Sequence, residues 1–588
     1  MKNNTLDLWL KRFQLAKDWR SPYDDKWDTF YKLYRFYLEE DEQNWKSQLF
    51  IPYIFTIIEN IVPRMVMNKP TIVLEGREEK DKDAARLHQA LIDYQLDQND
   101  IRIKLIQLIK SALIYGTGIA KVDWAFNTKN ILSKEPILTV GGVKTGEKTV
   151  KKPSVLYDGP NVEILDIKDF FIEPGATNIE LANWCIQRSV TTLKKLKESK
   201  IYDQKAVKKV KKSDNLNLNE FISGRDVVTD KDSTKEYQSD DEFVKVELLE
   251  CWTDEYVTTI ANRQIIIRQE ENPYPHQQKP FVRIVDTLVP NEFYGIGEAE
   301  RLEVLQRELN SVRNARMDNT KFRLNKVLLV ARSAGVNYKN LFFKPGAIIP
   351  ANDINQIRPL EMSDISGSSF NEETIIKGDI QRVSGISEYT MGRGNEEQTL
   401  ANNTATGIRL LQEAGNQIIK MKTLLFEEMG LREIGKMIVA LNNFFINQTR
   451  IIRIIGEEGK QWIKIKPEDI RGNFDVRVEA GSTEPVDQDL KRQQLIQLFQ
   501  LTLTNPYTSQ WINTPNFLDK LYEIFKVGDI ERLLYTPEQL AKAKAEIQRS
   551  KAQDILEAQP PQVEVMPEGG ETQPSQAGVS ATPAIKTK

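Results

Sequence analysis

The 588-residue chain has very little cysteine and histidine, with two residues of each. The two cysteines, Cys185 and Cys251, are too few for a disulfide framework and are compatible with a reducing compartment. The two histidines, His88 and His276, lie far apart in the sequence, and no HExxH helix or C-x-x-C pair occurs. The sequence therefore predicts neither a disulfide-stapled protein nor a metal site.

The chain also lacks a strong net charge and a long hydrophobic run. Its formal net charge is −3, which argues against one large basic surface for gripping nucleic acid. The most apolar stretch, 49–67, contains Glu59 and Arg64 and is interrupted by prolines, so it falls short of the roughly 20 apolar residues needed to cross a bilayer. Residues 1–13 lack the apolar core of a signal peptide.

No complete nucleotide motif is present. The stretch 141–149 has the GxxxxG spacing of a phosphate-binding loop, but Glu147 stands where the lysine is needed and would repel phosphates. The glycine pairs Gly116/Gly118 and Gly295/Gly297 lack the third glycine of a dinucleotide fingerprint and are interpreted as turns. We therefore predict no catalytic residue, no cofactor and no enzymatic activity.

Carboxylates are plentiful, and one sequence does not show which of them converge. We interpret the following as solvated surface groups and helix caps: Asp169, Glu173, Asp286 and Glu292. Nine aromatic residues crowd the N-terminus, and we expect them to serve core or subunit-interface packing rather than base stacking, because that stretch carries as many acids as bases. They are Trp9, Trp19, Trp27, Phe30, Tyr31, Tyr34, Phe36, Tyr37 and Trp45.

The composition is that of a folded protein, with 40% hydrophobic and 28% charged residues, and the length favours more than one folding unit. Residues 1–125 read as mainly helical, and we expect one helix to present Ile103, Ile106, Ile109, Ala112 and Leu113 on a single face. Alternation over 119–124 predicts a half-buried strand. Recurring glycine and lysine between 127 and 152 indicate a hairpin tip or mobile loop.

Strand-like segments dominate from 154 to 286, around a polar insert at 213–241. A helix over 297–325 then carries a narrow apolar seam at 3-4-3 spacing, typical of helix-to-helix packing. A short strand-and-turn unit follows over 326–360. Ser369 and Glu372 form the capping box of a second helix, which ends at Gly385.

The C-terminal part begins with a polar, glycine-rich segment at 386–403. A long apolar-periodic helix is predicted over 404–445, with bends at its glycines, which weaken a helix by about 1 kcal/mol each. Residues 474–479 alternate cleanly and predict a strand. The proline-rich end from 559 onward reads as a disordered tail.

This order of segments resembles the portal proteins of tailed bacteriophages, and several local strings strengthen the resemblance over roughly residues 10–545. They are Ile51-Pro52-Tyr53-Ile54, Ile114-Tyr115-Gly116-Thr117-Gly118 before Lys121-Val122, Asp169-Phe170-Phe171 with Pro174, Tyr294-Gly295-Ile296-Gly297 before Gln306 and Asn310, and Thr404-Ala405-Thr406-Gly407.

The resemblance implies an α+β, mainly helical portal fold with wing, stem, clip and crown regions, in a ring-forming homo-oligomer. The implied regions are an N-terminal α/β wing (1–296), a first stem helix (297–325), a clip (326–366), a second stem helix (367–385), a tunnel loop (386–403), a long kinked helix with wing strands (404–484), crown helices (485–550) and a Pro-rich disordered tail (551–588).

The resemblance further implies a dodecameric channel at one capsid vertex, through which double-stranded DNA is packaged and ejected. The implied partners are the terminase large subunit, head-tail adaptor or tail proteins, major capsid and scaffolding proteins, and the passing DNA, with no membrane. The implied location is the virion, after assembly in the host cytoplasm. The alternatives are a minor head or adaptor protein of the virion, and a nucleic-acid-processing enzyme.

Three sets of candidate residues follow. The tunnel loop is expected to face DNA through Glu388, Tyr389, Arg393, Asn395, Glu396 and Glu397. The basic clip is expected to meet either an acidic terminase surface or incoming DNA through Lys326, Arg332, Lys339, Lys344 and Arg358. The first stem helix is expected to pack through Leu302, Leu305, Leu309 and Val312.

Overall fold

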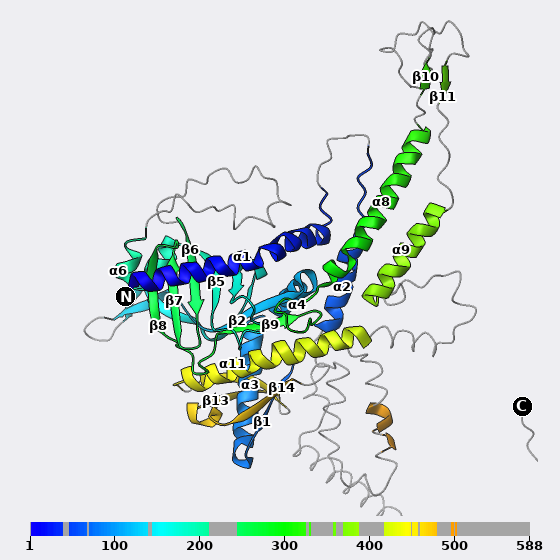
Figure 1. Cartoon of the computed structure of the whole chain (residues 1–588). Coiled ribbons are helices and arrows are strands. Elements are labelled where there is room, and N and C mark those ends of the chain that lie inside the picture. The colour runs from blue at the N-terminus through cyan, green and yellow to red at the C-terminus, as the bar shows by residue number, and fades with distance from the viewer. Residues whose placement is uncertain are drawn as a thin grey trace, which may run out of the picture. The chain divides into compact units, whose positions relative to one another are not determined.

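A computed structural model of the protein describes residues 2–38, 46–66, 70–138, 144–210, 244–324, 328–330, 357–359, 368–386, 417–448, 450–456, 459–478, 495–498 and 500–501. The chain divides into two compact units, Met1–Val486 and Asp487–Lys588. Every helix and strand named below lies in the first unit (Figure 1). This unit combines helices with mostly antiparallel sheets, so the predicted α+β class is confirmed.

The N-terminal part contains four long helices and one short strand. They are α1 (Lys2–Tyr34), α2 (Tyr53–Met65), β1 (Ile72–Gly76), α3 (Lys82–Gln98) and α4 (Ile101–Tyr115), with the 3-10 turn η1 (Glu79–Asp81) before α3. The first half of α1 packs Trp9 and Phe13 against a sheet, and its second half packs Trp27 and Phe30 into the main core. These four aromatics therefore serve packing, as expected.

A five-stranded antiparallel sheet has the order β4-β5-β6-β7-β8. Its strands are β4 (Phe170–Ile172), β5 (Cys185–Thr192), β6 (Lys245–Trp252), β7 (Tyr256–Ala261) and β8 (Ile265–Glu271), joined by the short turns and helices η2 (Ile167–Asp169), α5 (Leu193–Glu198) and α6 (Gln204–Val207). The polar insert predicted at 213–241 lies outside the described residues.

A second sheet has the order β3-β2-β9, built from β2 (Thr117–Leu138), β3 (Lys144–Leu165) and β9 (Phe281–Val285). The stretch 127–152, predicted as a hairpin tip or mobile loop, belongs mostly to two paired 22-residue strands. Residues from Lys144 onward are strand rather than the helix that a phosphate-binding loop requires, which supports the rejection of that motif.

The two sheets are linked by a buried lysine. Lys121 on β2 donates to Glu250 on β6 (2.6 Å) and to Gln187 on β5 (2.8 Å). Burial lowers the pKa of Lys121, but the charges of Glu250 and Asp123, with the hydrogen bond to Glu250, together raise it by more, so the amine stays charged. The strand predicted at 119–124 is confirmed, yet its polar position 121 is buried too, because strands β5 and β6 of the five-stranded sheet pack over it.

The remaining elements of the unit include α8 (Glu298–Leu324), β10 (Leu328–Val330), β11 (Ile357–Pro359), α9 (Ser368–Ser384), the π-helical turn η8 (Glu427–Leu431), α11 (Arg432–Phe445), β12 (Arg450–Gly456), β13 (Gly459–Ile465), the 3-10 turn η9 (Pro467–Ile470) and β14 (Phe474–Val478). Helical residues 417–426 lead directly into η8. Gly430 lies in this π-helical turn, at one of the predicted bends. The first part of the predicted long helix, 404–416, lies outside the described residues.

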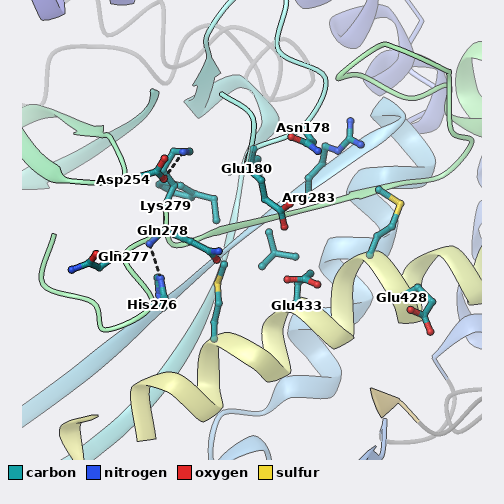
Figure 2. A pocket seen from close by; sticks show the side chains of 15 residues that line it. Asn178, Glu180, Asp254, His276, Gln277, Gln278, Lys279, Arg283, Glu428 and Glu433 are labelled. Carbon is teal, nitrogen blue, oxygen red and sulfur yellow. Dashed lines mark hydrogen bonds and ion pairs between the residues drawn. The ribbon is translucent and has the colours of Figure 1, made fainter. Parts of the chain in front are cut away.

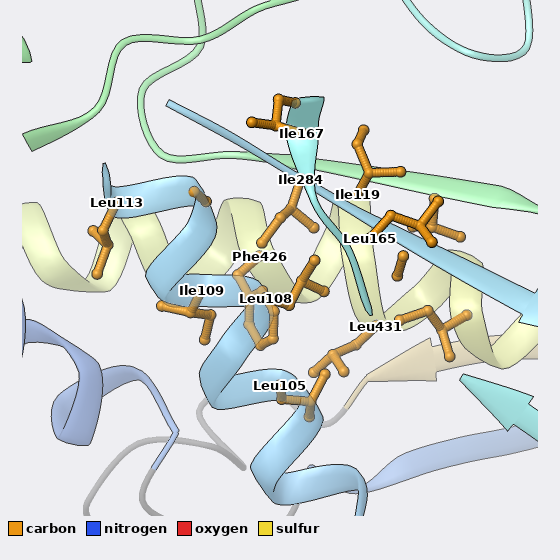
Figure 3. Close-up of a cluster of buried hydrophobic side chains, with 14 of the residues drawn as sticks. Leu105, Leu108, Ile109, Leu113, Ile119, Leu165, Ile167, Ile284, Phe426 and Leu431 are labelled. Carbon is orange, nitrogen blue, oxygen red and sulfur yellow. The ribbon is translucent and has the colours of Figure 1, made fainter. Parts of the chain in front are cut away.

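The main core forms where α4 meets β2, β3, β9 and the η8 segment. Figure 3 shows Leu105, Leu108 and Ile109 along α4, with Phe426 beside Leu108 and Ile284 close by; all five belong to one buried cluster. Helix α4 buries Ile101, Leu105, Leu108, Ile109, Ala112 and Leu113. The predicted α4 face is therefore wrong in part, since Ile103 is exposed and Ile106 only half-buried. The buried face instead follows Ile101, Leu105, Leu108 and Ala112, at spacings of four, three and four residues.

The expectation of an almost wholly helical N-terminus missed β1. This strand pairs antiparallel with β14 in the register Ile72↔Val478 to Gly76↔Phe474, about 400 residues away in sequence. The strand predicted at 474–479 is confirmed as β14. A pairing across such a separation is decided by tertiary contacts, which local periodicity does not report.

Candidate functional site

Helices α8 and α9 lie side by side and form the most distinctive helical pair of the unit (Figure 1). Leu302 and Leu309 of α8 are buried in the same hydrophobic cluster as Ile376 and Ile380 of α9. The other two predicted seam residues are half-buried against it; these are Leu305 and Val312. The structure thus brings the four predicted packing residues to one cluster.

An ion-pair network reinforces the second half of this helix pair. Glu373 of α9, almost fully buried, binds Lys377 (2.7 Å) and Arg316, with Arg313 at 3.6 Å. Burial raises the pKa of Glu373, but its bonds to Lys377 and Arg316 lower it by more. Three cations around one carboxylate leave this end of the pair basic.

A ladder of polar side chains on α8 holds an extended segment of the N-terminal part. Gln306 accepts from the backbone N–H groups of Tyr53 (3.1 Å) and Ile54 (3.3 Å), and its Nε2 donates to the Ile51 carbonyl (2.6 Å). The following residues of the ladder, at four-residue spacing, bind backbone N–H groups at 46–51 in the same way; they are Asn310, Asn314 and Asp318.

The hydrogen bonds of the ladder go to backbone groups of this segment. The match between the helix and the segment therefore depends on the spacing of these groups and not on the side chains of the segment. Residues four apart lie on one face of a helix about 6 Å apart along the axis, close to two residues of extended chain. Gln306 and Asn310 appeared in the sequence only as part of a family string. A polar i, i+4 row on a helix with apolar neighbours is the signal that could have found the ladder.

A buried charge cluster lies where α8, α9 and residues 417–426 meet. The Lys422 Nζ binds the carboxylates of Asp286, just after β9, and of Glu298, the first residue of α8, the latter at 2.7 Å. All three side chains are buried. Arg301 adds a second cation: it binds Glu298 (2.8 Å) and donates to the Val383 carbonyl at the end of α9.

Two glycine pairs position this cluster. Gly116, with φ +85°, follows α4, and a Cβ there would lie 1.9 Å from the Gly295 carbonyl oxygen. Gly295 N–H donates to the Thr117 hydroxyl (2.9 Å), and Asp286 N–H donates to the Gly116 carbonyl (3.1 Å). The two turns predicted from these glycines are therefore packed against each other, and they set Asp286 beside the start of α8.

The cluster holds more carboxylate than one lysine can neutralise. Burial and the Glu298 charge raise the pKa of Asp286, Lys422 opposes both, and the resulting pKa is about 7. One oxygen of each carboxylate, Asp286 Oδ2 and Glu298 Oε2, has no hydrogen-bond partner among the described residues. The interpretation of Asp286 as a solvated carboxylate was wrong, because the glycine packing buries it.

The other three carboxylates singled out from the sequence make no common site among the described residues. Asp169 binds Arg188 (3.0 Å), and Glu173 binds the Asn183 side chain (2.9 Å). Glu292 is exposed. No group of three or more histidine, cysteine or carboxylate side chains suited to a metal ion occurs in the described part of the chain.

Most of the predicted tunnel-loop and clip residues lie outside the described residues: Glu388, Tyr389, Arg393, Asn395, Glu396, Glu397, Lys326, Arg332, Lys339 and Lys344. Arg358 lies on β11, which pairs with β10 from Leu328↔Pro359 to Val330↔Ile357. The structure therefore places a two-stranded unit between α8 and α9.

A cavity of about 580 Å³ lies elsewhere, between the 276–283 segment, the 178–180 turn and α11 (Figure 2). Burial lowers the pKa of His276 to about 4, so its ring is neutral near pH 7 and accepts at Nδ1 from Gln278 N–H (3.0 Å). The cationic Lys279 is paired with Asp254 (2.6 Å). The lining offers polar and charged groups but, among its residues, no serine or cysteine nucleophile beside His276.

No helix among the described residues combines the length and apolar character needed to span a bilayer. The described residues show α8 and α9 packed together, an N-terminal segment bound along α8, and a buried charge cluster that joins both helices to residues 417–426. These contacts fix the position of the helix pair within the unit. A family model of the phage SU10 portal protein matches residues 127–564. The chain belongs to this family and is a phage portal protein.

Proposed function

We propose that the protein forms the dodecameric channel at one capsid vertex through which double-stranded DNA is packaged and ejected. The observation that carries the proposal is the family match, which spans α8, the strand unit, α9 and the helix after them. In this role the protein is a structural component of the virion and not an enzyme. Assembly takes place in the host cytoplasm.

We assign the segments of the chain to the regions of the proposed channel as follows. Residues 1–296 form the wing, α8 is the first stem helix, residues 326–366 form the clip and α9 is the second stem helix. Residues 386–403 are the tunnel loop, 404–484 the long kinked helix with wing strands, 485–550 the crown helices and 551–588 the tail. The cluster at Lys422 supports this division, because it ties both stem helices to the helix after the proposed loop.

The proposed channel passes DNA without holding it. A near-neutral chain binds phosphates weakly overall, and the proposed loop sets Glu388, Glu396 and Glu397 against Arg393. The basic clip offers a docking surface for the terminase large subunit, which supplies the packaging force. Adaptor or tail proteins, the major capsid protein and scaffolding proteins are the further partners of this proposal.

Negative-stain imaging of the purified protein tests the proposal directly. We expect class averages of a wide ring with a central hole, and native mass spectrometry should give twelve subunits. A protein that stays monomeric at every concentration and salt condition tried would contradict the proposal. Deletion of Met391–Glu396 should leave rings intact and reduce packaged DNA per particle, whereas wild-type packaging would remove the loop from the proposed channel.

A further inference from the structure

The β2–β3 hairpin extends well beyond the sheet that supports its base. Strand β2 pairs with β9 only from Thr117 to Lys121, whereas it pairs with β3 as far as Leu138. The base is fixed where Trp124 stacks on Phe445 of α11, with ring centroids 5.1 Å apart. Beyond it, residues 126–138 and 144–156, together called the arm, include strand edges without a third strand among the described residues.

The arm exposes large apolar side chains. Four of them are between 53% and 64% exposed, namely Phe126, Leu132, Val155 and Leu156. A two-stranded hairpin has little core of its own and is at best marginally stable in water. Long open strand edges with exposed hydrophobic residues are sites for pairing with another chain unless something covers them.

The charge of the arm points to what covers it. Residues 126–156 contain six lysines and two glutamates, so the arm carries +4 in a chain of net charge −3. The remainder of the same chain is accordingly acidic, at −7. Outside its own arm, a second copy therefore has a net charge opposite to that of the arm, and opposite charges promote association between copies.

We propose that the arm is a docking element that lies on the neighbouring copy of the chain, with its apolar residues buried and its lysines facing acidic surface. The inference rests on the proposed ring, in which every arm has a neighbour. It deepens that proposal by naming which segment crosses between subunits. Because the lysines contribute, assembly weakens as salt rises, since ions screen charges beyond about 8–10 Å near physiological strength.

Isotope-coded cross-linking locates the neighbour of the arm. Light and heavy-nitrogen protein are mixed before assembly, rings are isolated, and an amine-reactive linker joins lysines. Lys129 and Lys151 are both exposed on the arm. We expect light–heavy cross-links from these lysines to another copy. Rings in which both lysines give only same-isotope links would overturn the inference and leave the proposed ring intact.

A variant series tests whether the contact carries assembly. Phe126→Ser/Leu132→Ser/Leu156→Ser should raise the protein concentration for half-assembly at least ten-fold, while circular dichroism of the monomer stays unchanged. The matched control is Leu181→Ser, 72% exposed but outside the arm, which should assemble normally. Wild-type assembly of the triple variant would contradict the inference. If the wild-type protein itself forms no rings, that result would contradict the proposed ring rather than the role of the arm.

A charge series separates a second copy from nucleic acid as the partner. Lys129→Glu/Lys151→Glu should weaken ring assembly in the absence of DNA, whereas Lys200→Glu, an exposed lysine outside the arm, should not. Unchanged assembly combined with weaker DNA binding by the double variant would assign the arm to nucleic acid and overturn the docking inference.

Discussion

The hydrophobic core beneath α4 and the buried charge cluster of Lys422, Asp286 and Glu298, called the junction below, are both buried but are stabilised in different ways. The core joins aliphatic side chains such as Leu105, Leu108 and Ile109. The junction joins Lys422 to two carboxylates. Apolar packing tolerates small changes in shape, whereas a buried ion needs its partner in place, since an unpaired buried charge is strongly destabilising.

The difference shows what each region contributes. The core provides burial energy wherever hydrophobic side chains meet, without demanding one geometry. The junction fixes three chain segments at one point, because Lys422 binds only where Asp286 and Glu298 converge. In the proposed ring, such a fixed point would hold the helix pair in place relative to neighbouring copies.

The largest effect is expected at the junction. Lys422→Met should destabilise the protein by about 4 kcal/mol, because it leaves the buried Asp286 without its ion-pair partner and Glu298 with Arg301 alone. Urea unfolding measures the loss, and Lys420→Met, an exposed lysine nearby, is the control. The double variant Lys422→Met/Asp286→Asn should recover part of the stability. A double variant that is less stable than the single one would contradict the charge argument.

Leu108→Ala probes the core for comparison. Leu108 is fully buried, so its replacement should destabilise the protein by about 3 kcal/mol, through lost burial and the cavity that remains. Ile103→Ala on the same helix should change stability by less than about 0.5 kcal/mol, because Ile103 is exposed. Equal losses of stability in the two variants would mean that Ile103 is buried as well, as the sequence first predicted.

The sequence predicted elements of strong periodicity, such as α8, β14 and the start of β2. An element with one buried face repeats its apolar residues at the period of a helix or a strand, and this repeat is visible in the sequence. It did not predict β1, whose partner lies 400 residues away. Nor did it predict the junction, because a lysine at 422 in a helical pattern looks like any solvated lysine. Only folding brings it to Asp286.

His88 adds a pH test in a third buried setting, between α3 and α11. Its ring is 3.2 Å from the Asn442 amide, and burial lowers its pKa from 6.5 to about 4. The unfolded chain therefore takes up the proton first, so stability falls as pH drops from about 6.5 towards 4. The total loss is about 3 kcal/mol. His88→Gln should flatten this part of the pH–stability curve; an unchanged curve would assign the loss to other groups.

Gln306→Ala tests the polar ladder, which is held by hydrogen bonds rather than by apolar packing or buried ion pairs. The substitution removes the acceptor of the Tyr53 and Ile54 N–H groups and should cost about 1–3 kcal/mol. Hydrogen exchange should speed up at Ile54, which is buried, and not in α3. Glu308→Ala, exposed on the same helix, serves as the control. Unaltered exchange at Ile54 would mean that α2 protects this amide by itself.

The smallest effect is expected from an ion pair on the surface of α8. Glu303 binds Arg307 four residues on, at 3.0 Å, but the arginine side chain is well exposed. Water and salt screen such a pair, and holding both side chains costs entropy, so its net contribution is about 0.3–0.5 kcal/mol. Glu303→Ala should therefore barely shift the urea midpoint, and 0.5 M salt should abolish the shift. Lys422→Met should keep most of its cost in the same salt, because ions do not enter the junction. Should both variants respond alike to salt, the junction would be solvated, and its charges would no longer distinguish it from the surface of the helix that it anchors.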